Sequence, residues 1–174
     1  LVDPTFDPPG RRYSFGWGTA SVKTAGPALH ADELGRIDLV LVSHVQHADN
    51  LDDAGRALLP VAGTVLTTTR GERRLGLPNV RGLAPGETTE VTSDGRSSLW
   101  ITATPCRHGP PLSRSIVGDV IGFAIRREPG THVALWISQA LGAWAPCDPA
   151  ARSETPGAPP VALQPPPPPP APPP

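Results

Sequence analysis

The residues that could do chemistry are concentrated in one short segment, "SHVQHADN" at positions 43–50. Two histidines, His44 and His47, and one carboxylate, Asp49, stand there, and His108 lies in a second polar segment, "TPCRHGPP". Neutral imidazole and carboxylate are ligands that suit zinc and similar divalent metals. The pattern predicts a metal site formed by these four residues, with Asp49 as the candidate catalytic carboxylate. The alternative is that the polar side chains only cap a helix and satisfy loop backbone groups.

Both polar segments directly follow predicted strands, where functional loops are commonly held. Residues 37–43, "IDLVLVS", form a continuous apolar run, which is typical of a strand buried on both faces. Residues 98–106 alternate between apolar and polar, which indicates a second strand. After the first loop, residues 50–60 place leucines on one helical face, with Asn50 as the expected N-cap and Pro60 as the end.

The rest of the globular pattern is mainly strands with one short helix. Strands are predicted over 63–69 and 79–92, the latter broken by a Pro-Gly turn, and a hairpin over 119–138 turns at Pro129-Gly130. A short helix is predicted over 70–76 and closed by Gly76. The fold class is therefore α/β or α+β with a mixed, mostly β sheet.

Composition divides the chain into a domain at 1–141 and a tail at 142–174. Twelve of the 19 residues from Pro156 to Pro174 are proline, which favours a disordered, polyproline-like extended segment. Its alternative interpretation is a ligand for a groove of the SH3, WW or profilin kind. The chain has no methionine and opens on a strand-like "LVD", which is more typical of a fragment or a misjudged gene start.

Charge and hydropathy exclude several classes of protein. Lys and Arg total 15 against 16 for Asp and Glu, and no basic stripe points to nucleic acid. No apolar run approaches the roughly 18 residues of a membrane span. Two cysteines, Cys106 and Cys147, are too few for a disulfide scaffold. We expect both thiols to stay unpaired and the protein to be cytoplasmic.

The order of these segments resembles the metallo-beta-lactamase-fold hydrolases. The similarity is carried by "LVDPTFDPPG", "DELGRIDLVLVSHVQHADNLDDAGRALLP", "NVRGLAPGETTEV" and "ITATPCRHGPP", over roughly residues 1–138. The nearest branch contains proteins similar to ascorbate-6-phosphate lactonase and N-acyl-phosphatidylethanolamine phospholipase. The resemblance implies the N-terminal part of an αββα sandwich, with one or two metal ions, usually zinc, that activate a water.

Carried over by position, the family's site is incomplete in this chain. Counted forward from His44, the loop has Gln46 in place of the second His; counted back from the helix, it offers His47 and Asp49, with Asn50 in place of the last His. Which of Gln46 and His47 faces the metal therefore stays open.

Outside the loop, His108 matches the third His. The bridging Asp and the final His of the family have no counterpart after residue 138, where Gln139-Ala140-Leu141 follow. His30 and His132 are interpreted as loop and strand residues without a metal role.

The resemblance implies hydrolysis of an ester, lactone or phosphodiester, with a small-molecule or lipid-like substrate. This chain is expected to bind one zinc at most, weakly, with manganese as another candidate, and to be slow or inactive. Whether it is an enzyme stays open, and the alternative is a non-catalytic interaction protein whose polyproline tail binds a partner. A sandwich half without its second part leaves apolar sheet surface uncovered, which favours a homodimer, aggregation or marginal stability.

Overall fold

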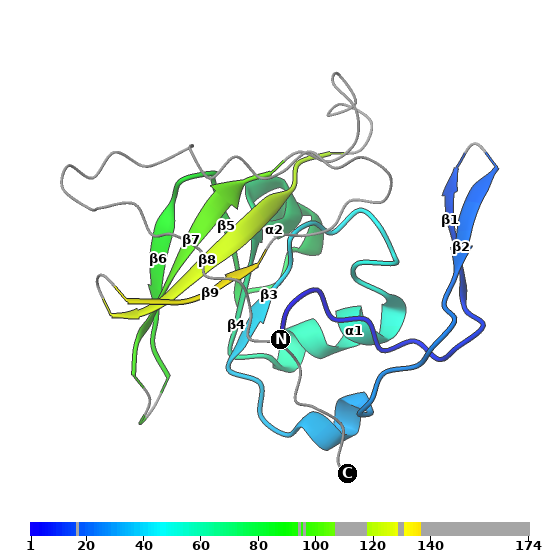
Figure 1. Cartoon of the computed structure of the whole chain (residues 1–174), viewed down its shortest axis with the longest axis horizontal. Coiled ribbons are helices and arrows are strands. Elements are labelled where there is room, and N and C mark those ends of the chain that lie inside the picture. The colour runs from blue at the N-terminus through cyan, green and yellow to red at the C-terminus, as the bar shows by residue number, and fades with distance from the viewer. Residues whose placement is uncertain (17, 94, 96, 107–117, 129–130, 137–174) are drawn as a thin grey trace, which may run out of the picture.

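The structure is a computed structural model that describes residues 1–136, apart from 17, 94, 96, 107–117 and 129–130 (Figure 1). The proline-rich tail, His108 and the domain boundary near residue 141 lie outside these residues. The predictions made for them, including the polyproline-binding partner, stay predictions.

A parallel sheet forms the centre of the fold. It contains β3 (Leu39–Leu41), β4 (Thr64–Thr68) and β5 (Val80–Leu83) in that order. The chain start adds to its edge, because Val2 forms a parallel bridge with Leu41. This confirms the predicted strands over 37–43 and 63–69 and the strand-like character of the first residues.

Two short helices connect the parallel strands. Helix α1 (Asp53–Leu58) continues into the 3-10 turn η2 (Leu59–Val61), and α2 (Thr69–Leu75) follows β4. Gly76 ends α2 in the left-handed region with φ 62°, as the sequence predicted. The predicted N-cap of α1 was wrong: the cap is Asp52, whose side chain accepts a hydrogen bond from the Gly55 N–H at 2.7 Å.

An antiparallel sheet packs on the other side. Its order is β6 (Thr88–Val91), β7 (Leu99–Pro105), β8 (Ile121–Glu128) and β9 (Thr131–Trp136). The antiparallel pairing of β8 with β9 confirms the predicted hairpin. Strands β5 and β6, which were expected on either side of a Pro-Gly turn, do not pair with each other, because each joins a different sheet.

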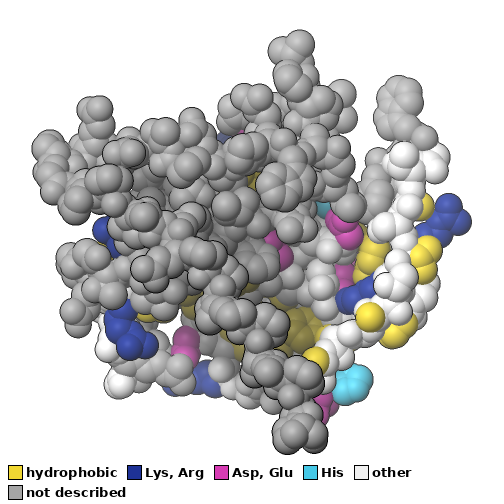
Figure 2. All heavy atoms as spheres, viewed as in Figure 1, with side chains coloured by type: hydrophobic (Ala, Val, Ile, Leu, Met, Phe, Trp, Pro, Cys, Tyr) yellow, Lys and Arg dark blue, Asp and Glu magenta, His cyan; other side chains and the backbone are white. Residues whose placement is uncertain are grey.

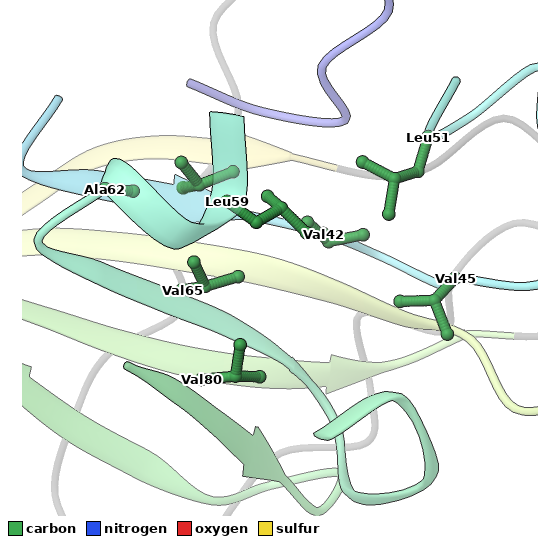
Figure 3. Packing of buried hydrophobic residues seen from close by; sticks show 8 residues of the cluster. Val42, Val45, Leu51, Leu59, Ala62, Val65 and Val80 are labelled. Atoms are coloured by element: carbon green, nitrogen blue, oxygen red, sulfur yellow. The ribbon is translucent and has the colours of Figure 1, made fainter. Parts of the chain in front are cut away.

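Two hydrophobic clusters hold the layers together. One lies between the parallel sheet and the segments on either side of α1, and it includes Val42, Leu51, Leu59 and Val65 (Figure 3). The other lies between the two sheets and contains Leu41, Leu66, Leu83, Ile101, Ala103, Ile121 and Phe123. Neighbouring residues of β3 thus serve opposite clusters, as expected for a strand buried on both faces. One face of the antiparallel sheet is covered in this way; a homodimer through its other face stays a prediction.

An N-terminal hairpin was not predicted from the sequence. Strands β1 (Arg12–Gly16) and β2 (Thr19–Val22) pair antiparallel and lie apart from both sheets, and the 3-10 helix η1 (Ala31–Leu34) follows (Figure 1). Three of the four β2 residues are exposed, Val22 among them, so this hairpin does not contribute a continuous apolar face to the core.

Charged side chains join this hairpin to the start of α1. The Asp52 carboxylate accepts hydrogen bonds from the Asp7 N–H at 2.6 Å and from Lys23 Nζ at 3.2 Å. The Tyr13 hydroxyl donates to Asp7 at 3.1 Å. Burial alone would raise the pKa of Asp52, but backbone N–H donors and Lys23 outweigh it and lower that pKa. Figure 2 shows acidic and basic side chains side by side in this region.

The structure has no candidate membrane span among the described residues, because none of its helices there is long and apolar enough to cross a membrane. Cys106 is disulfide-bonded, so the expectation that its thiol stays unpaired was wrong; Cys147 lies outside the described residues. The cytoplasmic location rested partly on unpaired cysteines and stays a prediction.

Candidate functional site

The candidate site begins where β3 ends. After Leu41 the chain stays buried through Val45, and His44 is only 2% exposed. The Ile121 N–H at the start of β8 donates to Ser43 O at 3.2 Å. The loop is therefore held at the junction of the two sheets, at the carboxyl end of a parallel strand, where α/β proteins commonly place functional side chains.

His44 and His47 lie next to each other in this loop. Their ring centroids are 5.2 Å apart and their planes are perpendicular. In a tetrahedral zinc site, nitrogens about 2.0–2.1 Å from the metal place two imidazole centroids roughly 5.2 Å apart. The separation of the rings is therefore compatible with two ligands of one metal ion.

The protonation of His47 also suits a ligand. Burial lowers the pKa of its imidazole, and the carboxylate of Asp49 opposes this only in part. Metals bind the neutral imidazole, so a lowered pKa keeps the ligand form available at a lower pH. A turn fixes the backbone here, since the Leu51 N–H donates to His47 O at 3.1 Å.

Gln46 is placed differently from its histidine neighbours. Its Oε1 accepts from the Val45 N–H at 3.1 Å, and its Nε2 donates to Asp119 O at 3.1 Å. Its amide also packs against Gly118, where a Cβ atom would overlap Gln46 Nε2. These bonds hold the Gln46 amide against the segment that leads into β8, while His47 contacts His44.

The other two predicted ligands are not brought into a complete site by the described residues. Asp49 is half-buried and acts electrostatically on His47. Within the part of the chain that the structure describes, no group of three or more His, Cys, Asp or Glu side chains could hold a metal. His108 lies outside that part. The ligand roles of all four residues therefore stay predictions.

A set of polar contacts around His44 was missed by the sequence analysis. Ser43 Oγ lies 2.9 Å from His44 Nδ1 and 3.3 Å from Asn50 Oδ1. Asn50 Nδ2 donates to Asp3 Oδ1 at 3.1 Å and to His44 O at 2.8 Å. Asp3 Oδ1 also accepts from the Ser43 N–H at 2.7 Å. Asp3 and Ser43 are 40 positions apart in the chain. No pattern in the sequence indicated that their side chains would meet at His44.

Comparison with protein families matches residues 1–138 to the family described as the beta-lactamase superfamily domain. None of the curated proteins matches the chain.

Among solved structures, the chain is similar to the isothiocyanate hydrolase from Delia radicum gut bacteria. The identity is 20% and the TM-score 0.53, over 74% of this chain and 51% of that one. The chain thus spans about half the length of that structure. It is also similar to Igni18, a metallo hydrolase from the archaeon Ignicoccus hospitalis KIN4/I, with 19% identity and a TM-score of 0.43, over 59% of this chain and 42% of that one. At 20% identity, the likeness to the isothiocyanate hydrolase shows a shared fold alone.

Proposed function

The chain belongs to the family of the beta-lactamase superfamily domain, and from this premise we propose that it acts as a hydrolase with one bound divalent metal, zinc. The substrate would be an ester, lactone or phosphodiester of a small or lipid-like molecule. The observation that carries the proposal is the perpendicular His44–His47 pair with its ring centroids 5.2 Å apart. Asp49 and His108 are the candidates for the remaining ligands.

The chain's own residues supply position and protonation. His44 is held almost without exposure at the end of β3, and α1 fixes the loop from outside, since Arg56 Nη2 donates to Val45 O at 3.1 Å. Such rigid support reduces the ordering that a ligand set must undergo when it binds a metal. When bound, zinc would polarise a carbonyl or phosphoryl oxygen and lower the pKa of a water, which is the chemistry of hydrolysis.

The site is proposed to bind its metal weakly. Catalytic zinc ordinarily takes three protein ligands and keeps an open position, and the described residues bring only two imidazoles together. Gln46, at the position of a family histidine, holds two backbone groups instead. We therefore expect a single weak metal and hydrolysis that is very slow or absent.

A zinc titration of the purified chain tests the metal site. Calorimetry should detect one zinc per chain in the wild type, and both His44→Ala and His47→Ala should lose it. His30→Ala is the matched control, because His30 is an exposed histidine outside the loop. Equal zinc affinity in the wild type and in both loop variants would show that the metal, if any, binds elsewhere.

The role of His108 has its own test. It is the one proposed ligand from outside the loop, so His108→Ala should abolish zinc binding while leaving the fold, measured by circular dichroism, unchanged. Unaltered binding would remove His108 from the site. Turnover of ester or phosphodiester substrates at ordinary enzyme rates of roughly 1–1000 per second would contradict the expectation of a weakened site.

A further inference from the structure

We propose that Asp3, Asn50 and Ser43 act as a hydrogen-bond relay that fixes His44 in the neutral tautomer with its proton on Nδ1. The three side chains are positioning residues: they contact His44 or each other. The effect is to leave Nε2 of His44 unprotonated, as a metal ligand must be. The consequence for metal binding rests on the proposed function, but the tautomer itself does not.

The direction of the relay is set at Asn50. Its Nδ2 lies near Asp3 Oδ1 and near the His44 carbonyl oxygen, at 3.1 and 2.8 Å. A carboxylate and a backbone carbonyl can only accept hydrogen bonds. Turning the amide over would place Asn50 Oδ1 against both acceptors, so Nδ2 must face them and Oδ1 must face Ser43.

Ser43 passes this direction on to His44. Asn50 Oδ1 can only accept, so the hydrogen bond across 3.3 Å uses the single proton of the Ser43 hydroxyl. Ser43 Oγ then acts as acceptor toward His44 Nδ1, 2.9 Å away. Because the other partner in that bond must supply the proton, His44 carries it on Nδ1. The hydroxyl is fully buried, since Ser43 is 0% exposed, so water does not compete for it there.

The backbone conformation of Asp3 places its carboxylate at the start of the relay. Asp3 has φ 41° and is the only non-glycine residue with positive φ among the described residues. Strained backbone of this kind persists where the surroundings hold it, often at functional sites. Here the strain brings one carboxylate oxygen to two donors, the Ser43 N–H and Asn50 Nδ2. Gly55 allows the approach, because a Cβ atom there would overlap the Pro4 carbonyl oxygen.

The experiment reads the tautomer by long-range ¹H–¹⁵N NMR of the full chain with labelled histidine and no metal. It is done well above the ordinary histidine pKa of about 6.5, and His44→Gln assigns the signals of His44. The wild type should show a protonated Nδ1 and an unprotonated Nε2. Ser43→Ala should return His44 to a mixture of tautomers, and its zinc affinity should fall by about 10-fold to 100-fold.

Conservative variants distinguish loss of the hydrogen-bond relay from loss of the folded structure. Asp3→Asn keeps an oxygen acceptor and tolerates positive φ, so it should retain the wild-type tautomer. Asp3→Ala removes one of the two acceptors that orient Asn50 Nδ2, so it should increase the fraction of the other tautomer. Ser93→Ala is the matched control, because it removes a serine hydroxyl that bonds Asp38 at 3.0 Å, away from His44. Circular dichroism confirms that each variant is folded.

Two results would overturn the proposal. One is a wild-type His44 with its proton on Nε2, and the other is an unchanged His44 tautomer in folded Ser43→Ala. Because the spectra are recorded without metal, a wild type that shows the Nδ1 tautomer but binds no zinc supports the relay while refuting the proposed metal site.

Discussion

Substitution of Gly55 by alanine should destabilise the protein, although helix propensity alone predicts the opposite. Gly55 is buried inside α1. A Cβ atom there would overlap the carbonyl oxygen of Pro4 and lie 2.7 Å from its carbonyl carbon. Both atoms belong to backbone and cannot turn away as a flexible side chain could. The segment from Asp3 to Asp7 would therefore have to move off α1.

The size of the effect follows from three contributions. Exchange of glycine for alanine inside a helix would stabilise by about 1 kcal/mol. Overpacking against backbone costs about 1–3 kcal/mol. Movement of the segment would also strain the buried hydrogen bond from the Asp7 N–H to Asp52 at 2.6 Å, and a bond to a charged group contributes about 1.5–3 kcal/mol. We expect a net loss of about 2–4 kcal/mol in the free energy of unfolding and a melting temperature lower by about 10 °C.

Urea unfolding followed by circular dichroism measures this loss. Ala57→Gly is the matched control: Ala57 is exposed on the same helix, and its substitution should cost only about 1 kcal/mol. If Gly55→Ala proves as stable as the wild type or more stable, the close approach of Pro4 to α1 is wrong. The support that this contact gives to Asp3 would then be wrong as well.

Two further substitutions test buried polar groups. Thr67 Oγ1 is buried and has no hydrogen-bond partner in the described structure, so Thr67→Val should raise the free energy of unfolding by about 1 kcal/mol; a clear loss in urea unfolding would indicate a hidden partner. Asp52 has a pKa below its ordinary value of 3.8 in the fold, so its stabilisation is present above that pH and is lost as the pH falls through the lowered pKa. Asp52→Asn should therefore be less stable than the wild type at neutral pH, and the difference should shrink in acid; a difference that is constant with pH would contradict this.

Local patterns determined much of the fold in advance. The apolar run at 37–43 predicted a strand buried on both faces. A strand with apolar side chains on both faces must be covered on both sides, and the parallel sheet of an α/β fold provides that cover. Gly76 predicted the end of α2, because the left-handed conformation there favours glycine. The hairpin at 119–138 also followed from the Pro129-Gly130 turn between two strand-like segments. In each case the cause lies within a few neighbouring residues.

The sequence predicted the candidate ligands of the loop at 43–50 only in part. The sequence identified His44 and His47 as candidate ligands because their side chains alone define the chemistry. It could not decide between His47 and Gln46, because a loop has no fixed period that assigns side chains to one face. Only the packed structure shows the Gln46 amide bonded to Asp119 O and the His47 ring beside His44.

Tertiary structure alone decided the groups that meet from distant parts of the chain. Asp3 reaches Ser43 across 40 positions, and Asp7 reaches Asp52 across 45. Asn50 was a reasonable helix cap by residue type, yet its amide bonds Asp3 and His44 O, and Asp52 caps α1 instead. Residue type states which hydrogen bonds a side chain can make; which of them it makes depends on the partners that folding brings within reach.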